Sequence, residues 1–397
     1  MPDLINLIKD AQARLRGVVS PTPLVFSASL SKALGFECHL KLENLQKTGS
    51  FKARGAYNRI AAPGSAGKKA GVITASSGNH GQGVAWAATL LGLRSTVVMP
   101  ETTPIIKYMA AKGYGAEVVF HGGSFDEALG RAIELAVATG AAFIPPFDDE
   151  LVMAGQGTIG LEIMDALPDV DAVAVPIGGG GLISGIASAI KSVKPNARVI
   201  GAQAEASRSC SASLEAGRPV SVEKSPSIAD GIAVKRVGDK TFPIIKRLVD
   251  EVCAVGEDAI AAAILQLLER KKLVVEGAGA VPLAAAMSGK LPQGIKKAVF
   301  VISGGNIDVT TLDRVIRLGL LKEGRVMKVS TVIPDAPGSL ARLTNVLASQ
   351  KANILHVVHE RDSEDAVVGS TRIEVILEVE SHSHGAAVRK ALAEAGY

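Results

Sequence analysis

Short apolar runs alternate with longer stretches of helical spacing along most of this chain. The short runs are rich in β-branched residues and have the length of strands, whereas the stretches between them place apolar residues three or four positions apart. The predicted strands are 37–43, 71–77, 95–100, 116–122, 172–177, 198–205 and 298–303. The predicted helices are an opening helix that ends near Gly17, then 78–91, 105–112, 125–139, 155–167, 183–193 and 259–272. Strands that alternate with helices form parallel sheets, so the pattern predicts an α/β fold with two doubly wound sheets.

A different pattern begins after residues 320–325. Strands are predicted at 326–333, 353–360 and 370–380, and helices at 339–350 and 383–395. The order β-α-β-β-α is that of a small ferredoxin-like α+β module, which in its complete form has a fourth strand after the last helix. We therefore expect a catalytic region at 1–322, with a smaller lobe at about 50–150 inserted in it, and a separate module at 326–397 that lacks its last strand.

Composition narrows the class of protein. The chain has 397 residues, 42 of them glycine, and few aromatic residues, which suits a soluble α/β protein. Its formal net charge of +4 is too small to indicate nucleic-acid binding. Three cysteines without metal-ligand spacing indicate reduced thiols. The N-terminal segment carries acidic residues, unlike a signal peptide, and no apolar run is long enough to span a bilayer. These features predict a cytoplasmic protein without a membrane partner.

The segment QKTGSFKARGA at 46–56 carries the most specific chemistry. It places Lys52 in a polar, turn-rich stretch between Phe51 and Ala53. A lysine forms Schiff bases when burial destabilises its ammonium form. For a lone lysine, a surface position in a glycine-containing loop is the better interpretation. The preceding Glu43-Asn44-Leu45-Gln46 and the motifs below favour a functional lysine.

Two further segments lie where a strand gives way to a helix. SSGNHGQG runs from Ser76 to Gly83, and four glycines occupy 178–181. Unpaired N–H groups at a helix start favour an anion, and glycines let the backbone approach a phosphate. The alternatives are an ordinary helix cap at Ser77 and a dinucleotide-binding turn at the four glycines, which Glu205 at the end of the next predicted strand would favour. The dinucleotide fingerprint requires a third glycine where this chain has Ser184.

These segments, with Glu276-Gly277-Ala278-Gly279 and Ser303-Gly304-Gly305-Asn306, resemble the serine/threonine dehydratases. Members of that family are fold-type II pyridoxal-phosphate enzymes with a two-lobed, tryptophan synthase β-like fold. The resemblance implies that Lys52 holds pyridoxal 5′-phosphate covalently beside Phe51, and that Asn79 contacts its phenolic oxygen. It also implies that Ser303 faces the pyridine nitrogen. The residues implied for the phosphate are Gly178, Gly179, Gly180 and Gly181, and those for the substrate carboxylate are Ser76, Ser77, Gly78 and Asn79.

The resemblance is to threonine ammonia-lyases (threonine dehydratases) that bear a regulatory domain, and implies the conversion of L-threonine to 2-oxobutanoate and ammonia. L-Serine would give pyruvate, with Lys52 as the base in both reactions. Ser303 offers only a neutral hydrogen bond, so the ring is a weaker electron sink and β-elimination is favoured over racemisation. A serine racemase or dual racemase/dehydratase, with Ser77 as the acid on the opposite face, stays open. A non-catalytic amino-acid-binding regulatory protein is disfavoured by the intact Lys52.

Two acidic residues have less certain roles. Glu276 is expected to line the same cleft or to cap the following helix. Glu205 matches the first ligand of the divalent-cation site of the related serine racemases. Ser209, Cys210 and Ser211 occupy the stretch where the second acidic ligand is expected. No bound divalent metal is therefore expected, and a monovalent cation held by carbonyl groups stays open.

DAPGSL at 335–340 and ANIL at 352–355 resemble the ACT domain, an amino-acid-sensing unit. The resemblance implies an allosteric amino-acid effector, with isoleucine or valine as the natural candidates because threonine deamination opens isoleucine biosynthesis. The effector carboxylate is expected at the helix start near Gly338, with Asn353 beside it across an interface in a homo-oligomer. The alternative is a module that serves only for dimerisation.

Overall fold

The computed structural model describes residues 4–63, 70–223, 225–361 and 367–397. The chain divides into two compact units, Met1–Asp308 and Val309–Tyr397, and each is described by itself. Within the described residues no helix is both long and apolar enough to cross a membrane.

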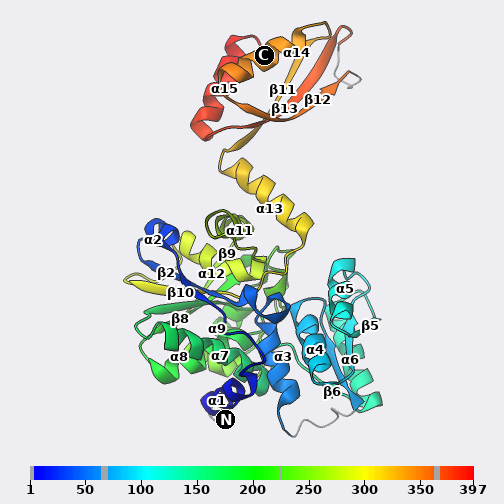
Figure 1. The fold of residues 1–397 in the computed structure, drawn as a ribbon, viewed down its shortest axis with the longest axis vertical. Helices are drawn as coiled ribbons and strands as arrows, with labels where there is room; N and C mark the ends of the chain where they lie inside the picture. The colour runs from blue at the N-terminus through cyan, green and yellow to red at the C-terminus, as the bar shows by residue number, and fades with distance from the viewer. Residues whose placement is uncertain (1–3, 64–69, 224, 362–366) are drawn as a thin grey trace. The chain divides into compact units, whose positions relative to one another are not determined.

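The first unit contains a six-stranded sheet in the order β1-β2-β10-β7-β8-β9 (Figure 1). Its strands are β1 (Leu24–Phe26), β2 (Glu37–Leu42), β7 (Ala172–Pro176), β8 (Arg198–Ala204), β9 (Glu251–Val255) and β10 (Lys297–Ile302). Only the edge strand β1 is antiparallel to its neighbour. Phe300 in β10 pairs with Leu40 on one side and Ala174 on the other. Both faces of β10 are buried, which explains its continuous apolar sequence.

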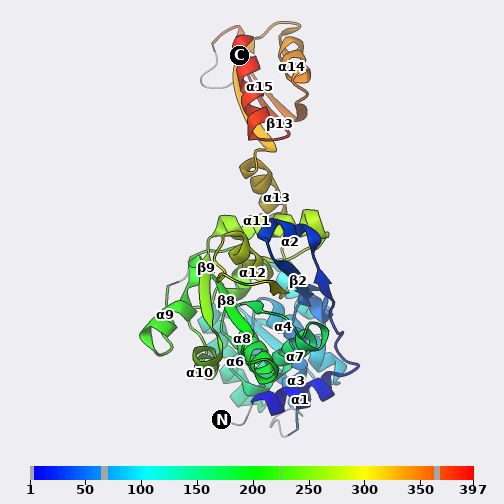
Figure 2. The same ribbon diagram turned by 90° about the vertical axis from the view of Figure 1, so that its left-hand side faces the viewer.

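Helices cover both faces of this large sheet, as Figure 2 shows. Val299 and Val301 of β10 belong to a core with apolar residues of α7 (Glu150–Ala166), α8 (Gly181–Val193) and α10 (Thr241–Leu248). α1 (Leu4–Leu15) packs on α7 and α8, while α12 (Gly277–Met287), beside α11 (Glu257–Lys271), covers the opposite face. The remaining helices longer than one turn are α2 (Ala28–Leu34) and α9 (Ser209–Ala216). The predicted double winding is confirmed.

A smaller, wholly parallel sheet in the order β5-β4-β3-β6 forms the second lobe of this unit. Its strands are β3 (Val72–Ala75), β4 (Ser95–Met99), β5 (Glu117–Phe120) and β6 (Ala142–Phe143). Residues of α3 (Lys52–Ala61), α4 (Asn79–Leu90) and α5 (Ile105–Gly113) pack on one face. α6 (Phe125–Thr139) covers the other face with three buried alanines and begins at a capping box formed by Ser124 and Glu127.

The second unit begins with α13 (Val309–Lys322) and continues into a three-stranded antiparallel sheet. The strands β11 (Val326–Pro334), β12 (Asn353–Glu360) and β13 (Ser370–Glu378) lie in the order β11-β13-β12. Ile373, Val375 and Leu377 face a core shared with α14 (Ser339–Ser349) and α15 (His382–Glu394). The predicted β-α-β-β-α order is confirmed, and the described residues contain no strand after α15. The predicted domain boundary at 322 stays a prediction.

Two segments differ from the sequence prediction. Lys52, predicted in a turn-rich stretch, is the first residue of α3. α7 begins at Glu150, capped by the Asp149 side chain, rather than at Gly155. The glycines of α7 weaken its helical signal, but tight packing requires them: a Cβ atom on Gly155 would lie 2.7 Å from the carbonyl oxygen of Arg54.

Candidate active site

Lys52 lies at the meeting point of several segments of the first unit. The short helix η2 (Lys47–Gly49) precedes it, and Phe51 N donates to Ser303 O at 3.0 Å. Lys52 Nζ donates to Pro146 O at 2.7 Å and lies 5.2 Å from the centre of the Phe51 ring. Burial lowers the pKa of the amine to about 8, although the charge of Glu276 acts to raise it. The neutral, nucleophilic form is therefore far more accessible than for a surface lysine.

The SSGN segment joins β3 to α4 and leaves the helix start open. Gly78 is the N-cap residue, and no side chain caps the helix. Ser76 Oγ accepts a bond from Gly78 N at 3.2 Å. The interpretation of Ser77 as an ordinary helix cap is therefore wrong. The free N–H groups at this start of a twelve-residue helix are suited to a carboxylate.

Asn79 and Glu276 form a polar contact within the site. Asn79 Nδ2 lies 2.8 and 2.9 Å from the two carboxylate oxygens of Glu276, and Asn79 Oδ1 accepts a bond from Asn306 Nδ2 at 2.8 Å. Glu276 is the N-cap residue of α12, but its side chain makes no capping bond and contacts Asn79 instead. Burial raises the pKa of Glu276 to about 7, which the bond from Asn79 partly opposes.

The four glycines at 178–181 connect β7 to α8. Gly180 has φ +95°, which favours glycine, and it begins α8 without any side-chain cap. A Cβ atom on Gly179 would lie 2.3 Å from Cγ of Phe147. Thr241 Oγ1 donates to Gly179 O at 2.8 Å and holds the loop. This is a tight turn whose backbone N–H groups and helix dipole suit a phosphate.

Ser303 ends β10 and is 1% exposed. Its carbonyl group accepts the bond from Phe51, and Gly304 forms a bridge with Ser50. The Ser303 hydroxyl group could donate a hydrogen bond to a ring nitrogen.

Direct contacts bring these segments together. Lys52 bonds Pro146, and the next residue, Phe147, packs on the glycine loop. Glu276 N donates to Gly304 O at 3.1 Å. The predicted residues at 51–52, 76–79, 178–181, 276 and 303 thus share one site, and their roles stay predictions. The site offers an amine of lowered pKa, an anion cradle and a serine hydroxyl group, which are the groups that pyridoxal phosphate needs.

Comparison with known proteins identifies the family. The sequence model described as pyridoxal-phosphate dependent enzyme matches residues 15–304, and the ACT domain model matches residues 329–396. The chain belongs to the pyridoxal-phosphate-dependent enzyme family. It is 50% identical over 390 residues to the L-threonine ammonia-lyase of Thermotoga maritima, covering 98% of this chain and 97% of the relative. It is 46% identical over 317 residues to the catabolic L-threonine dehydratase TdcB of Escherichia coli, covering 79% of this chain and 96% of the relative.

Solved structures of the same family resemble the first unit. The processed form of threonine deaminase isoform 2 from Solanum lycopersicum has 40% identity and a TM-score of 0.74, covering 79% of this chain and 93% of that chain. Maize serine racemase has 35% identity and a TM-score of 0.75, covering 80% and 98%. Structural likeness therefore extends to both lyases and racemases of the pyridoxal-phosphate-dependent enzymes.

The sequence analysis assigned no role to some residues of this site. Asn306 appeared only as the last letter of a motif, although its position just after β10 was a usable signal. Pro146 and Phe147 carry no motif signal and reach the site only through folding. His80 lies within the SSGNHGQG segment. Its Nε2 lies 3.1 Å from Ile144 O, and burial lowers its pKa to about 3, so it stays neutral.

Glu205, the possible cation ligand, pairs with Lys290. Glu205 lies in the short helix η4 (Glu205–Ser207), and Lys290 Nζ lies 3.1 Å from its carboxylate and 2.6 Å from Ala254 O. No cluster of three or more His, Cys, Asp or Glu suited to a metal occurs within the described ranges. A monovalent cation stays a prediction.

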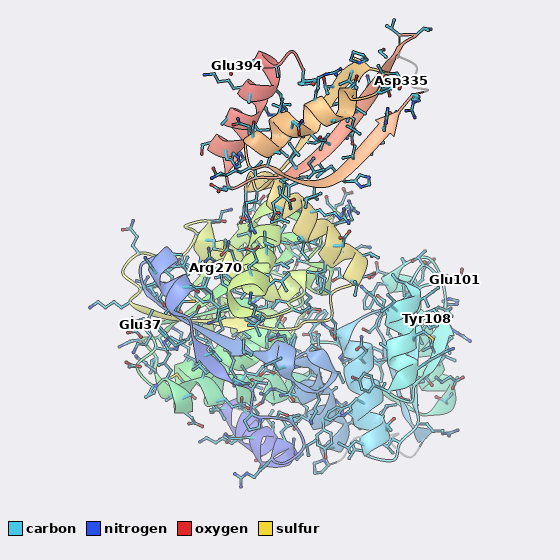
Figure 3. All side chains as sticks on the ribbon, turned by 45° about the horizontal axis from the view of Figure 1, so that its top comes forward. Glu37, Glu101, Tyr108, Arg270, Asp335 and Glu394 are labelled. Atoms are coloured by element: carbon cyan, nitrogen blue, oxygen red, sulfur yellow. The ribbon has the colours of Figure 1, made fainter. Side chains whose placement is uncertain are left out.

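The predicted effector residues both lie in the second unit. Gly338 begins α14 with φ +86° and no side-chain cap. Asn353 Nδ2 donates to Glu378 Oε2 at 3.0 Å. Asp335, labelled in Figure 3, pairs with Arg361 at 3.2 Å on the turn before α14. The helix start is open to an anion, while the amide group of Asn353 is engaged within its own chain.

Proposed function

We propose that this chain deaminates L-threonine to 2-oxobutanoate and ammonia, with conversion of L-serine to pyruvate as a side activity. The environment of Lys52 supports this proposal most strongly. Lys52 is half-buried and hydrogen-bonded to Pro146, beside the glycine loop and Ser303. Support also comes from relatives matched over nearly their whole length: the L-threonine ammonia-lyases of Thermotoga maritima and Geobacter sulfurreducens each have 50% identity.

Pyridoxal phosphate, when bound, withdraws electrons and stabilises negative charge at the substrate α-carbon. Lys52 would hold it covalently, and the free Lys52 amine would take the α-proton of the substrate. The lowered pKa of about 8 supports this role, because a useful base titrates near the working pH.

The other residues bind and orient. The N-terminus of α4, with Ser76, Ser77 and Gly78, receives the substrate carboxylate. Asn79 donates to the phenolic oxygen of the cofactor, and the glycine loop at 178–181 holds the phosphate. Ser303 gives the pyridine nitrogen only a neutral hydrogen bond, which limits electron withdrawal and favours expulsion of the β-hydroxyl group.

The atoms balance without an oxidant. Loss of the α-proton and the β-hydroxyl group releases water and an enamine. Hydrolysis of the enamine consumes that water, so one threonine gives one 2-oxobutanoate and one ammonia.

A racemase is the second candidate, because serine racemases from maize and Dictyostelium discoideum resemble the first unit at 35% and 38% identity. Ser77 would then supply a proton from the opposite face. The full-length match to L-threonine ammonia-lyases, including the ACT domain, favours elimination.

A product assay decides between the two activities. The holoenzyme is incubated separately with L-threonine, L-serine and D-serine, and keto acid, ammonia and enantiomer are measured. We expect equal amounts of 2-oxobutanoate and ammonia from L-threonine and little D-serine from L-serine. Formation of D-serine faster than pyruvate would make the chain a racemase.

We further infer that the second unit senses isoleucine or valine and that the reaction serves isoleucine formation. Gly338 would receive the effector carboxylate at the start of α14, with Asn353 across the interface of a homo-oligomer. Catabolic relatives match only 317 residues of this chain, which supports a regulatory task for the rest.

A further inference from the structure

Four groups from distant segments form one line of hydrogen bonds beside Lys52. Asn306 Nδ2 donates to Thr48 O at 2.7 Å and to Asn79 Oδ1 at 2.8 Å. Asn79 Nδ2 in turn donates to the Glu276 carboxylate at 2.8 and 2.9 Å. The line connects η2, the residues after β10, the start of α4 and the start of α12.

The direction of this line is fixed at its Thr48 end. A backbone carbonyl group only accepts, so Asn306 must present its nitrogen to Thr48. Both amide hydrogens of Asn306 are then used, and Asn79 must present its oxygen to Asn306. The Asn79 nitrogen therefore faces Glu276, whose carboxylate oxygens accept from it. Reversing the Asn79 amide would bring its nitrogen against the nitrogen of Asn306, so that two donors would meet.

The backbone at Thr48 is unusual and is shaped around Asn306. Thr48 has φ +61°, a conformation that is rare for a β-branched residue. Gly49 follows with φ +70°, and a Cβ atom there would lie 2.4 Å from Asn306 Oδ1. Backbone conformations of this kind persist where the surroundings impose them, and they cluster at functional sites.

We propose that Asn306, anchored on the Thr48 carbonyl group, is the positioning residue that sets the amide orientation of Asn79. The Asn79 nitrogen carries two hydrogens, and Glu276 needs only one of them. The second is available to the phenolic oxygen of pyridoxal phosphate, which needs a donor when it is ionised. This inference rests on the proposed function, because it assumes that Asn79 contacts that oxygen.

The test compares Asn306→Asp with Asn306→Ala in the holoenzyme. The carboxylate of the Asp variant accepts from Asn79 and reverses its amide, so that the oxygen faces the phenolic group. The phenol then keeps its proton, and we expect the visible band of the bound cofactor to move to shorter wavelength. Turnover of L-threonine should fall by about tenfold or more with little change in KM, as for loss of one hydrogen bond to a charged group. The Ala variant should show a smaller shift, because its Asn79 amide is free but not reversed.

Asn196→Asp is the matched control, since Asn196 is exposed and takes no part in the site. It should leave the band and the turnover unchanged. An unchanged band in both Asn306 variants would overturn the inference; if the Asp variant does not fold, the Ala variant alone decides in the same way. If Asn306 has only a structural role, its variants should have lowered thermal stability but an unchanged visible band of the bound cofactor. Failure of the proposed function is distinct, because wild-type holoenzyme would then form no 2-oxobutanoate.

Discussion

Lys52 and Glu276 are two ionisable residues whose pKa values burial moves toward each other. The pKa of Lys52 falls to about 8, and that of Glu276 rises to about 7. Burial disfavours the charged form of each, and their mutual attraction only partly opposes it. Groups that titrate near neutral pH move protons at low cost, which is the requirement for a base that serves at the α-carbon.

The lowered pKa of Lys52 predicts how cofactor uptake depends on pH. Only the neutral amine attacks an aldehyde, so the rate at which apoenzyme takes up pyridoxal phosphate should rise with pH and level off above pH 8, with its midpoint near the pKa of about 8. Stopped-flow absorbance after mixing apoenzyme with the cofactor measures this rate. A rate that keeps rising about tenfold per pH unit toward 10, as for an ordinary lysine, would contradict the assignment.

At the scale of elements, α3 is anchored by a buried charge network two residues beyond Lys52. Arg54 is 1% exposed and lies 2.8 Å from Glu43 Oε1 and 2.6 Å from Glu162 Oε1. Lys41 also pairs with Glu162, at 2.5 Å. Two cations and two carboxylates thus tie α3 to α7 and to the end of β2. The charges of Glu43 and Glu162 raise the pKa of Arg54 despite its burial.

Removing one member of this network should be costly. Arg54→Met keeps most of the side-chain volume but leaves Glu43 buried without its partner, so we expect a loss of about 3–5 kcal/mol in the free energy of unfolding. Urea denaturation of the apoprotein measures it. Arg317→Met, at an exposed pair on α13, serves as the control and should change stability by less than about 1 kcal/mol. Equal effects of the two substitutions would show that the network does not hold α3.

The glycine loop between β7 and α8 gives a second prediction at this scale. In Gly179→Ala the new Cβ atom would lie 2.3 Å from the Phe147 ring, so the loop or the ring must move. We expect folded protein whose dissociation constant for pyridoxal phosphate rises by about tenfold or more, as for the loss of one hydrogen bond to a charged phosphate. Gly130→Ala on α6 is the control, because no atom lies within 4 Å of its Cβ position. Unchanged cofactor affinity in Gly179→Ala would remove the phosphate from this loop.

At the scale of the whole molecule, the sequence predicted the features that a local pattern of residues encodes. Buried strands such as β7 and β10 are continuous apolar runs, so their positions and the α/β class followed directly. The start of α7 was hidden because close packing on α3 requires glycines, which weaken helical periodicity. Pro146 and Phe147 reach the site through tertiary contacts that no local spacing encodes. The direction of the Asn79 amide depends on Thr48, 31 positions earlier. It could be found only from the structure.

The two-unit architecture predicts that catalysis and sensing separate. A chain without residues 326–397 should retain threonine turnover, because the catabolic relatives match only 317 residues of this chain. It should no longer respond to isoleucine or valine, since an effector acts only through different affinity for two states.

In the intact chain, Gly338→Asp should weaken the effector response by placing a charge at the start of α14. Gly338→Asn is the uncharged control, and asparagine tolerates the local φ of +86°. Calorimetry with isoleucine, valine and threonine measures the response. If none of the three binds the intact chain, the second unit is a structural module.

Identifying the residue that binds the cofactor covalently tests the proposed site most directly. Holoenzyme is reduced with borohydride and digested, and the masses of its peptides are measured by mass spectrometry. The turnover of Lys52→Ala is measured in parallel. We expect the reduced cofactor on the peptide that contains Lys52. We also expect that the Lys52→Ala protein folds but forms no detectable 2-oxobutanoate. Cofactor mass on another lysine, or a tenth of wild-type turnover in Lys52→Ala, would contradict it.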